Sequence, residues 1–193
     1  MRKRLLGVAL IVLAVLGGCG GAPPNGATTA PQVDWPTADV TSENVKAAIG
    51  GLDDPGHAVK VKGHLVSVDV TDHAGTDDPG DKIVTVVIDP GEVWDETHFL
   101  KIAGGSATAA MEVLFKNPKV QRVVFEAQTT MVDQYGKSNK ETGARIMLER
   151  ATADKIDWKG FKDKQLVAYT SIYDIADDWD VHPGILAKAK PPK

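Results

Sequence analysis

The most constraining feature of the sequence is the run Ile-Val-Thr-Val-Val-Ile at 83–88, in which both alternating faces are largely apolar. A strand of this kind is typical of the middle of a sheet, where neighbouring strands and a covering layer exclude water. We therefore expect a central strand at 82–89. A chain built around such a strand needs partner strands beside it and helices that cover the sheet.

Alternating apolar residues predict three further strands, at 58–71, 120–133 and 142–150. In the first of them the apolar face changes phase between Gly63 and Val66, which predicts a bulge or a bend at that point. A loop at 134–140, with Gly136 at its turn, joins the last two strands.

Apolar residues at helical spacing indicate helices at 41–50, 95–116 and 152–161. The middle of the second helix, 104–110, has only small side chains, so this helix either packs closely against a sheet or breaks at Gly104-Gly105. The segment 166–179 has features of both a helix and a strand, and we assign it to a helix.

The order of these elements predicts an α+β fold. We expect an antiparallel sheet of about four strands, built from two helix–hairpin units, with helices on one face and a helical C-terminal tail. Residues 41–187 suffice for a single globular domain, and residues 188–193 are expected to be disordered.

The N-terminus has the pattern of an export signal. Arg2, Lys3 and Arg4 form a positive segment, and no charged or polar side chain occurs in 5–16. Twelve helical residues span about 18 Å, which is less than the roughly 30 Å of a bilayer core. The apolar segment is therefore too short for a stable transmembrane helix and suits a signal peptide.

The next residues, Leu16-Gly17-Gly18-Cys19, resemble the lipobox of bacterial lipoproteins. The resemblance implies cleavage after Gly18 and attachment of lipid to Cys19, the only cysteine in the chain. It predicts a signal peptide at 1–18, a lipidated flexible tether at 19–40, and a mature protein anchored on the extracytoplasmic face of the cell membrane. The alternative is an ordinary secretory signal with an unrelated cysteine.

The charge of the chain argues against some partners. The sequence has 22 basic and 26 acidic residues, a net charge of −4. Removal of Arg2, Lys3 and Arg4 with the signal would leave 19 basic residues against 26 acidic ones, a net charge of −7. An acidic protein lacks the basic face that binds nucleic acid or anionic lipid, so we expect no nucleic-acid partner.

No motif for catalysis, a cofactor or a transition metal stands out. Ser106 lacks the Gly-x-Ser-x-Gly pattern of a hydrolase nucleophile, and no two of the five histidines have the spacing of a zinc pair on one helix face. The loop from Asp69 to Asp81 offers several carboxylates that suit calcium, although the spacing is not that of an EF-hand. We expect no cofactor and no metal site, and calcium at this loop stays an open alternative.

Aromatic and acidic residues are densest between 173 and 183. Aromatic side chains surrounded by charge favour a binding surface, here with Tyr173, Trp179 and His182. Tyr135 in the turn 133–136 is a fourth candidate contact. The alternatives are structural, because Tyr173 and Trp179 could close the edge of the core and 133–136 could be a plain turn.

Four short motifs mark the second half of the chain: Phe115-Lys116-Asn117, Asp133-x-Tyr135-Gly136, Lys155-Ile156-Asp157-Trp158 and Val181-His182-Pro183. In these motifs the part from Leu114 onward resembles a group of uncharacterised lipoproteins from Gram-positive bacteria and their phages or integrated elements. The resemblance implies a role in the cell envelope and no particular activity.

These observations predict a non-enzymatic envelope lipoprotein that binds another protein. In one form of this hypothesis, a prophage or mobile element encodes the protein, which then has a function at the cell surface. The second hypothesis is an envelope module that binds a small ligand or Ca²⁺. An envelope hydrolase ranks third, because no residue stands out as a nucleophile or a general base.

Overall fold

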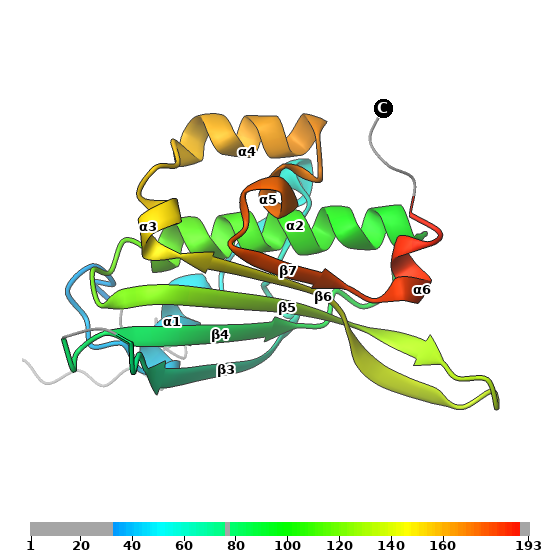
Figure 1. The fold of residues 1–193 in the computed structure, drawn as a ribbon, viewed down its shortest axis with the longest axis horizontal. Coiled ribbons are helices and arrows are strands. Elements are labelled where there is room, and N and C mark those ends of the chain that lie inside the picture. Colours follow the sequence, from blue (N-terminus) through cyan, green and yellow to red (C-terminus); the bar gives the residue numbers. More distant parts are fainter. Residues whose placement is uncertain (1–32, 76–77, 190–193) are drawn as a thin grey trace, which may run out of the picture. The chain divides into compact units, whose positions relative to one another are not determined.

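The computed structural model describes residues 33–75 and 78–189, and it contains two sheets and six α-helices in this part of the chain (Figure 1). The elements are α1 (Ser42–Ile49), β1 (Asp53–Asp54), the 3-10 helix η1 (Pro55–His57), β2 (Val59–Lys60), β3 (Leu65–Asp72), β4 (Lys82–Ile88), α2 (Glu96–Leu114), β5 (Val120–Val132), β6 (Ser138–Glu149), α3 (Arg150–Ala153), α4 (Trp158–Val167), α5 (Ser171–Ile175), β7 (Asp178–Val181) and α6 (Pro183–Leu186). The expected signal peptide at 1–18 and the lipidated Cys19 lie outside the described residues.

The main sheet has five strands in the order β3-β4-β5-β6-β7. The predicted mixed α+β class is confirmed, and so are the two hairpins, β3–β4 and β5–β6, each preceded by a helix. The expectation of a purely antiparallel sheet of four strands was wrong, because β4 and β5 pair in parallel. The helix α2 carries the chain from the end of β4 back to the start of β5, and a crossover of this kind joins parallel strands.

The predicted central strand is β4, which pairs with β3 on one side and with β5 on the other. The predicted change of phase near Gly63–Val66 is also present. Gly63 has a positive φ of 76° between β2 and β3, and the β3–β4 register shifts between Leu65 and Ser67. The expected single strand at 58–71 is therefore two strands, of which β2 pairs with β1 in a separate small sheet.

The segment expected to be helical at 166–179 ends in a strand. The helices α4 and α5 occupy much of this region, but β7 adds a fifth strand beside β6. Arg145 on β6 forms an ion pair with Asp178 on β7, with Nη1 and Oδ2 at 2.6 Å. The helical assignment was wrong for β7 because its pairing is decided by a distant strand and not by local spacing.

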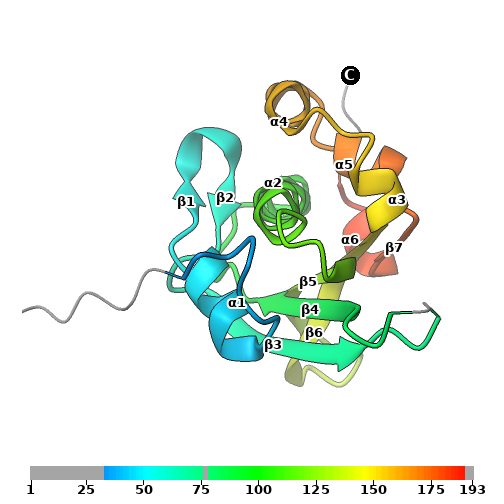
Figure 2. The same cartoon turned by 90° about the vertical axis from the view of Figure 1, so that its left-hand side faces the viewer.

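The long helix α2 begins after Asp95, whose side chain accepts a hydrogen bond from the His98 N–H. It continues unbroken through Gly104-Gly105, where neighbouring segments come very close to the helix backbone. A Cβ at Gly105 would lie 2.4 Å from the carbonyl oxygen of His57, and one at Gly104 would lie 2.6 Å from Nε2 of Gln165. The small residues therefore admit the β1–β2 connection and the helix α4 beside α2, and Figure 2 shows both next to α2.

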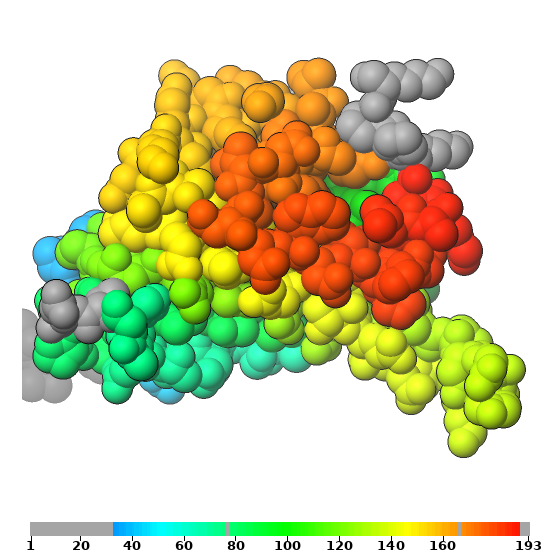
Figure 3. All heavy atoms as spheres, in the orientation of Figure 1, coloured from blue at the N-terminus to red at the C-terminus, as the bar shows by residue number. Residues whose placement is uncertain are grey.

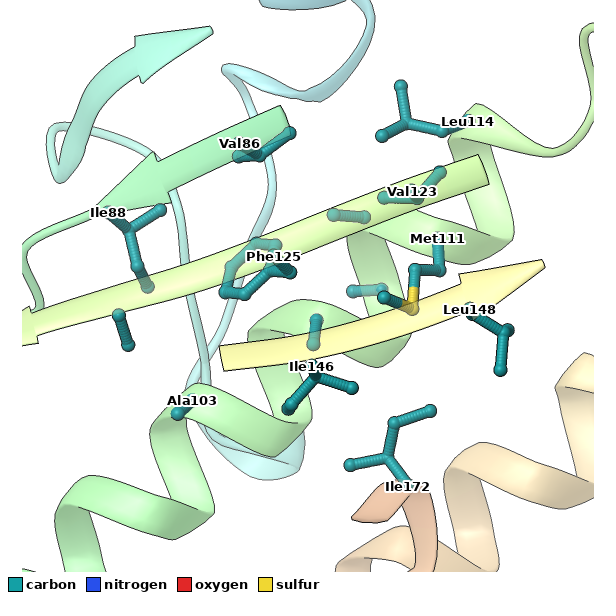
Figure 4. Close-up of a cluster of buried hydrophobic side chains, with 14 of the residues drawn as sticks. Val86, Ile88, Ala103, Met111, Leu114, Val123, Phe125, Ile146, Leu148 and Ile172 are labelled. Atoms are coloured by element: carbon teal, nitrogen blue, oxygen red, sulfur yellow. The ribbon is translucent and has the colours of Figure 1, made fainter. Parts of the chain in front are cut away.

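The core lies between α2 and the face of the sheet that α2 covers (Figures 2 and 4). Strand residues such as Val86, Phe125 and Ile146 meet Met111 and other side chains of α2 there, and all of them are buried. Burial of these side chains stabilises the packing of α2 on the sheet by roughly 1.5–3 kcal/mol for each large residue. In both ribbon views α4 and α5 lie on the same side of the sheet as α2.

The folded part of the chain includes residues before the expected domain start at 41. Trp35 is buried and donates its indole N–H to the Leu114 carbonyl oxygen at the C-terminal end of α2. Asn117 donates from Nδ2 to the carbonyl oxygens of Trp35 and Ala38, each at 2.8 Å. Residues 33–40, the last part of the expected tether, therefore pack on the domain. In the described ranges, no helix is both long and apolar enough to span a membrane.

Candidate binding site

Two of the predicted contact residues, Tyr173 and Trp179, meet at the edge of the sheet. The ring of Tyr173 on α5 and that of Trp179 on β7 are 5.9 Å apart and nearly perpendicular, at 83°. Tyr173 is buried and donates its hydroxyl to the Leu100 carbonyl oxygen at 3.3 Å. Burial, with a smaller effect of Tyr169, raises the pKa of Tyr173 far above its ordinary value, so this hydroxyl stays neutral.

These two rings line a hollow of about 340 Å³ that we call the aromatic groove. It is lined by Leu100, Tyr169, Thr170, Tyr173, Asp174, Trp179, Val181, Leu186 and Ala189. Tyr173 forms part of the core, as the structural alternative predicted, whereas Trp179 is 44% exposed. Tyr173 therefore forms a buried side of the groove, and Trp179 forms an accessible side.

The groove has two polar groups without a partner in the described residues. Within 33–75 and 78–189, the indole N–H of Trp179 has no acceptor, and the exposed carboxylate of Asp174 has no cationic partner. Among the described residues that line the groove, Asp174 is also the only charged one. A ligand could thus bury apolar surface, accept one hydrogen bond and offer one positive charge.

His182 follows β7 directly but lies in a different hollow. Its Nδ1 accepts the Gly184 N–H at 3.1 Å, which caps α6, and its Nε2 lies 3.9 Å from a carboxylate oxygen of Glu141. The hollow measures about 570 Å³ and we call it the arm cleft. Its lining residues are Glu96, Thr130, Met131, Val132, Asp133, Glu141, His182, Gly184, Ile185 and Lys188.

Tyr135 lies at the tip of a hairpin that continues beyond the sheet. We call residues 128–142 the hairpin arm, and Figures 1 and 3 show it projecting from the rest of the domain. Asp133 fixes the turn, because its Oδ1 accepts the N–H groups of Tyr135 and Lys137 at 2.8 and 2.9 Å. Gly136 has the positive φ of 79° that the turn requires, and Tyr135 remains largely exposed.

The hairpin arm starts at a bulge in β6. The β5–β6 register shifts beside Ala127, so Gly143 has no partner on β5. A Cβ at Gly143 would lie 2.7 Å from the ring of Phe99 and 2.8 Å from Ile185. Lys140 also holds the arm through an ion pair with Asp89, at 2.6 Å. The Lys140 contact lowers the pKa of Asp89, and the N–H of Gly91 contributes to the same shift.

Sequence reasoning missed the most exposed aromatic side chain. Trp94 lies in the loop between β4 and α2, is 90% exposed, and stacks on His98 with ring centres 4.6 Å apart. Tyr169 and Leu186 in the aromatic groove were also missed. A tryptophan outside every predicted strand, in the acidic segment 89–97, was the available signal for Trp94.

Three of the carboxylates considered for calcium have protein partners. Asp72 pairs with Lys82, Asp78 accepts the Gly80 N–H, and Asp81 accepts a hydrogen bond from Gln121. Asp77 lies outside the described residues. Throughout 33–75 and 78–189, no group of three or more His, Cys, Asp or Glu side chains is arranged to hold a metal ion.

A comparison with protein-family models, one with curated proteins and one with solved structures found no match to this chain. The resemblance to envelope lipoproteins of Gram-positive bacteria therefore stays a prediction. Any function must be inferred from the surfaces of the domain and from the N-terminal sequence.

Proposed function

We propose that this protein is a non-enzymatic envelope lipoprotein, anchored in the cell membrane through lipid on Cys19, that binds another protein on the extracytoplasmic side. The lipobox-like Leu16-Gly17-Gly18-Cys19 supports the anchor. The observation that supports protein binding is the concentration of exposed apolar side chains at one end of the domain.

We call this end the distal end. It comprises Val66, Trp94, Val132, Tyr135 and Leu186, which are 55%, 90%, 66%, 79% and 53% exposed. Contacts between their elements place these elements at the same end of the domain. Asp89, before Trp94, pairs with Lys140 of the hairpin arm and accepts a hydrogen bond from His64, close to Val66. Lys188, after Leu186, pairs with Glu96 at the start of α2.

The chain joins the domain at the other end. Trp35 contacts Leu114, the last residue of α2, whereas Trp94 precedes its first turn. With 19 residues, α2 is about 28 Å long. A lipid on Cys19 would thus connect to the domain far from the distal end, which would be left free to meet a partner. Exposed apolar side chains that gather on one surface are typical of an interaction site.

Site-specific photo-cross-linking in producing cells tests the proposal. A photoreactive residue replaces Trp94 or Tyr135, and as the matched control it replaces Ala47, which is exposed on α1 near the chain's entrance to the domain. We expect the same adduct from positions 94 and 135, none from 47, and none when Cys19→Ala removes the anchor. Absence of an adduct, or an equal adduct from position 47, would contradict protein binding by the distal end.

Small-ligand binding is a second candidate function, favoured by the arm cleft. Its volume of about 570 Å³ falls within the range of roughly 300–1,000 Å³ typical of ligand sites. His182, Glu141 and Lys188 supply polar groups to it. A ligand that binds only the folded state raises the melting temperature, so a thermal-shift screen that includes Ca²⁺ tests this alternative.

A further inference from the structure

We propose that the aromatic groove binds a proline-rich segment of the partner protein in the polyproline II conformation, with a basic residue next to the prolines. This inference rests on the proposed protein-binding function and names the chemistry of the partner. It depends on the groove's rings, its free hydrogen-bond donor and its single charge.

The rings of the groove suit proline side chains. Tyr169, Tyr173 and Trp179 line it together with apolar groups such as Leu186. The rings of Tyr173 and Trp179 are nearly perpendicular, and Trp179 is the accessible ring of the three, because Tyr169 and Tyr173 are buried. Proline-rich segments bind aromatic-lined grooves of this kind, and they lose little entropy because the polyproline II helix is already formed in the free segment.

The free donor suits the backbone of such a segment. A polyproline II helix has no internal hydrogen bonds, so its carbonyl oxygens need donors from water or from a binding partner. The Trp179 indole N–H has no acceptor in the described part of the chain, and its side chain is accessible. Trp179 can therefore pack against a proline and donate to a carbonyl oxygen of the same segment.

The negative charge of Asp174 favours a basic residue next to the prolines of the bound segment. The Asp174 carboxylate is exposed and has no cationic partner among the described residues. Lys101 has its Nζ 5.8 Å from the centre of the Tyr169 ring, but Lys101 itself does not line the groove. A lysine or arginine in the segment could pair with Asp174, whereas an acidic residue at this place would be repelled.

Fluorescence anisotropy with a labelled peptide tests the inference on the full chain in detergent micelles. The probe contains three Lys-Pro-Pro repeats, and the control peptide contains three Lys-Ala-Ala repeats of equal charge. We expect saturable binding of the probe alone. Trp179→Ala should weaken binding more than about tenfold, as for a central aromatic contact. Asp174→Asn should weaken it about two- to fivefold, with less effect at high salt.

Trp94→Ala is the matched control variant, since it also removes an exposed tryptophan, and it should bind the probe like the wild type. Circular dichroism shows whether each variant is folded, and Asp174→Asn changes only an exposed group. Equal binding of the two peptides, equal loss in Trp94→Ala and Trp179→Ala, or no binding at all would overturn the inference.

The chain itself ends in Lys190-Pro191-Pro192-Lys193, directly after Ala189 of the groove lining. If the probe binds only after these four residues are deleted, the occupant is the protein's own C-terminus, and a partner segment is excluded. The photo-cross-linking result separates the two proposals. An adduct at the distal end without peptide binding would overturn only the proline-rich segment. Peptide binding without an adduct would overturn partner binding by the distal end, while the chemistry inferred for the groove would stand.

Discussion

Single residues decide how closely the loops approach α2. At Gly105 a side chain would meet backbone, because the His57 and Ala58 carbonyl oxygens would lie 2.4 and 2.9 Å from a Cβ. The Ser106 hydroxyl accepts the Lys60 N–H in the same place, at 2.9 Å. The small residues at 104–106 thus hold the β1–β2 loop against the helix. The sequence predicted close packing at these residues. It did not predict that the β1–β2 connection and α4, and not the sheet, would be the neighbours.

Gly105→Ala should therefore destabilise the protein by about 1–3 kcal/mol, as is typical of overpacking against groups that cannot move freely. Urea unfolding measures this loss. Gly51→Ala is the control, because a Cβ at Gly51 has no heavy atom within 4 Å. A Gly105→Ala variant as stable as the wild type would show that the β1–β2 loop can shift away from α2.

Asp89 links the hairpin arm to the loop that bears Trp94. Its pKa is lowered, first by the hydrogen bond from Lys140 and then by the Gly91 N–H, against the opposing effect of burial. A carboxylate with a lowered pKa stabilises the folded state above its ordinary pKa, and this stabilisation is lost as the pH falls through the lowered value.

Asp89→Asn should accordingly lower the melting temperature at neutral pH, and the difference from the wild type should shrink as the pH falls below about 4. Melting curves at several pH values check this. Asp69→Asn is the control, since Asp69 is exposed and forms no ion pair in the described ranges. A difference between Asp89→Asn and wild type that stays constant down to acid pH would rule out the ion pair as its cause.

At the scale of elements, the segments with strong local signals were predictable. The apolar run of β4, the small-residue helix α2 and the hairpin β5–β6 all lie close to the expected bounds. The parallel pairing of β4 with β5 and the strand β7 were not predicted. Both depend on contacts between segments far apart in the sequence, and β7 has only four residues, Asp-Trp-Asp-Val, to signal its conformation.

The candidate site was predictable only in part for the same reason. The density of aromatic and acidic residues at 173–183 did locate Tyr173 and Trp179, which meet across α5 and β7. His182 was placed with them on sequence proximity alone. Its side chain instead lies in the arm cleft, where it caps α6, so neighbours in the sequence face separate hollows.

The hairpin arm should be the least protected part of the sheet. Beyond Ala127, β5 pairs with β6 alone, whereas from 120 to 127 it pairs with β4 as well. Most side chains of β6 in the arm are also exposed. We expect amide hydrogens at 129–141 to exchange with deuterium faster than those at 122–127, because opening the arm exposes little core. Equal protection of both parts of β5 would point to a further contact that covers the arm.

At the scale of the whole molecule, the two ends of α2 have different roles. The C-terminal end holds the segment 33–40 through Trp35 and Asn117, and the N-terminal end lies beside the exposed side chains of the distal end. Asn117 is buried and also donates a hydrogen bond to the Ala38 carbonyl oxygen. These contacts hold the segment 33–40 against the C-terminal end of α2. The segment 33–40 and the distal end therefore lie at opposite ends of the compact unit formed by residues 32–193.

Cys19→Ala should separate attachment from folding. Cys19 belongs to residues 1–31, which are separate from the compact unit 32–193, so its substitution should leave the melting temperature of the domain unchanged. Because acyl chains contribute about 0.8 kcal/mol for each buried methylene, their loss should move the protein from the membrane pellet to the soluble fraction. Ser138→Ala, at an exposed site in the hairpin arm, should stay in the pellet. A Cys19→Ala variant that resists an alkaline carbonate wash as well as the wild type does would show that any membrane attachment lies elsewhere in the chain, and it would contradict the proposed lipid anchor.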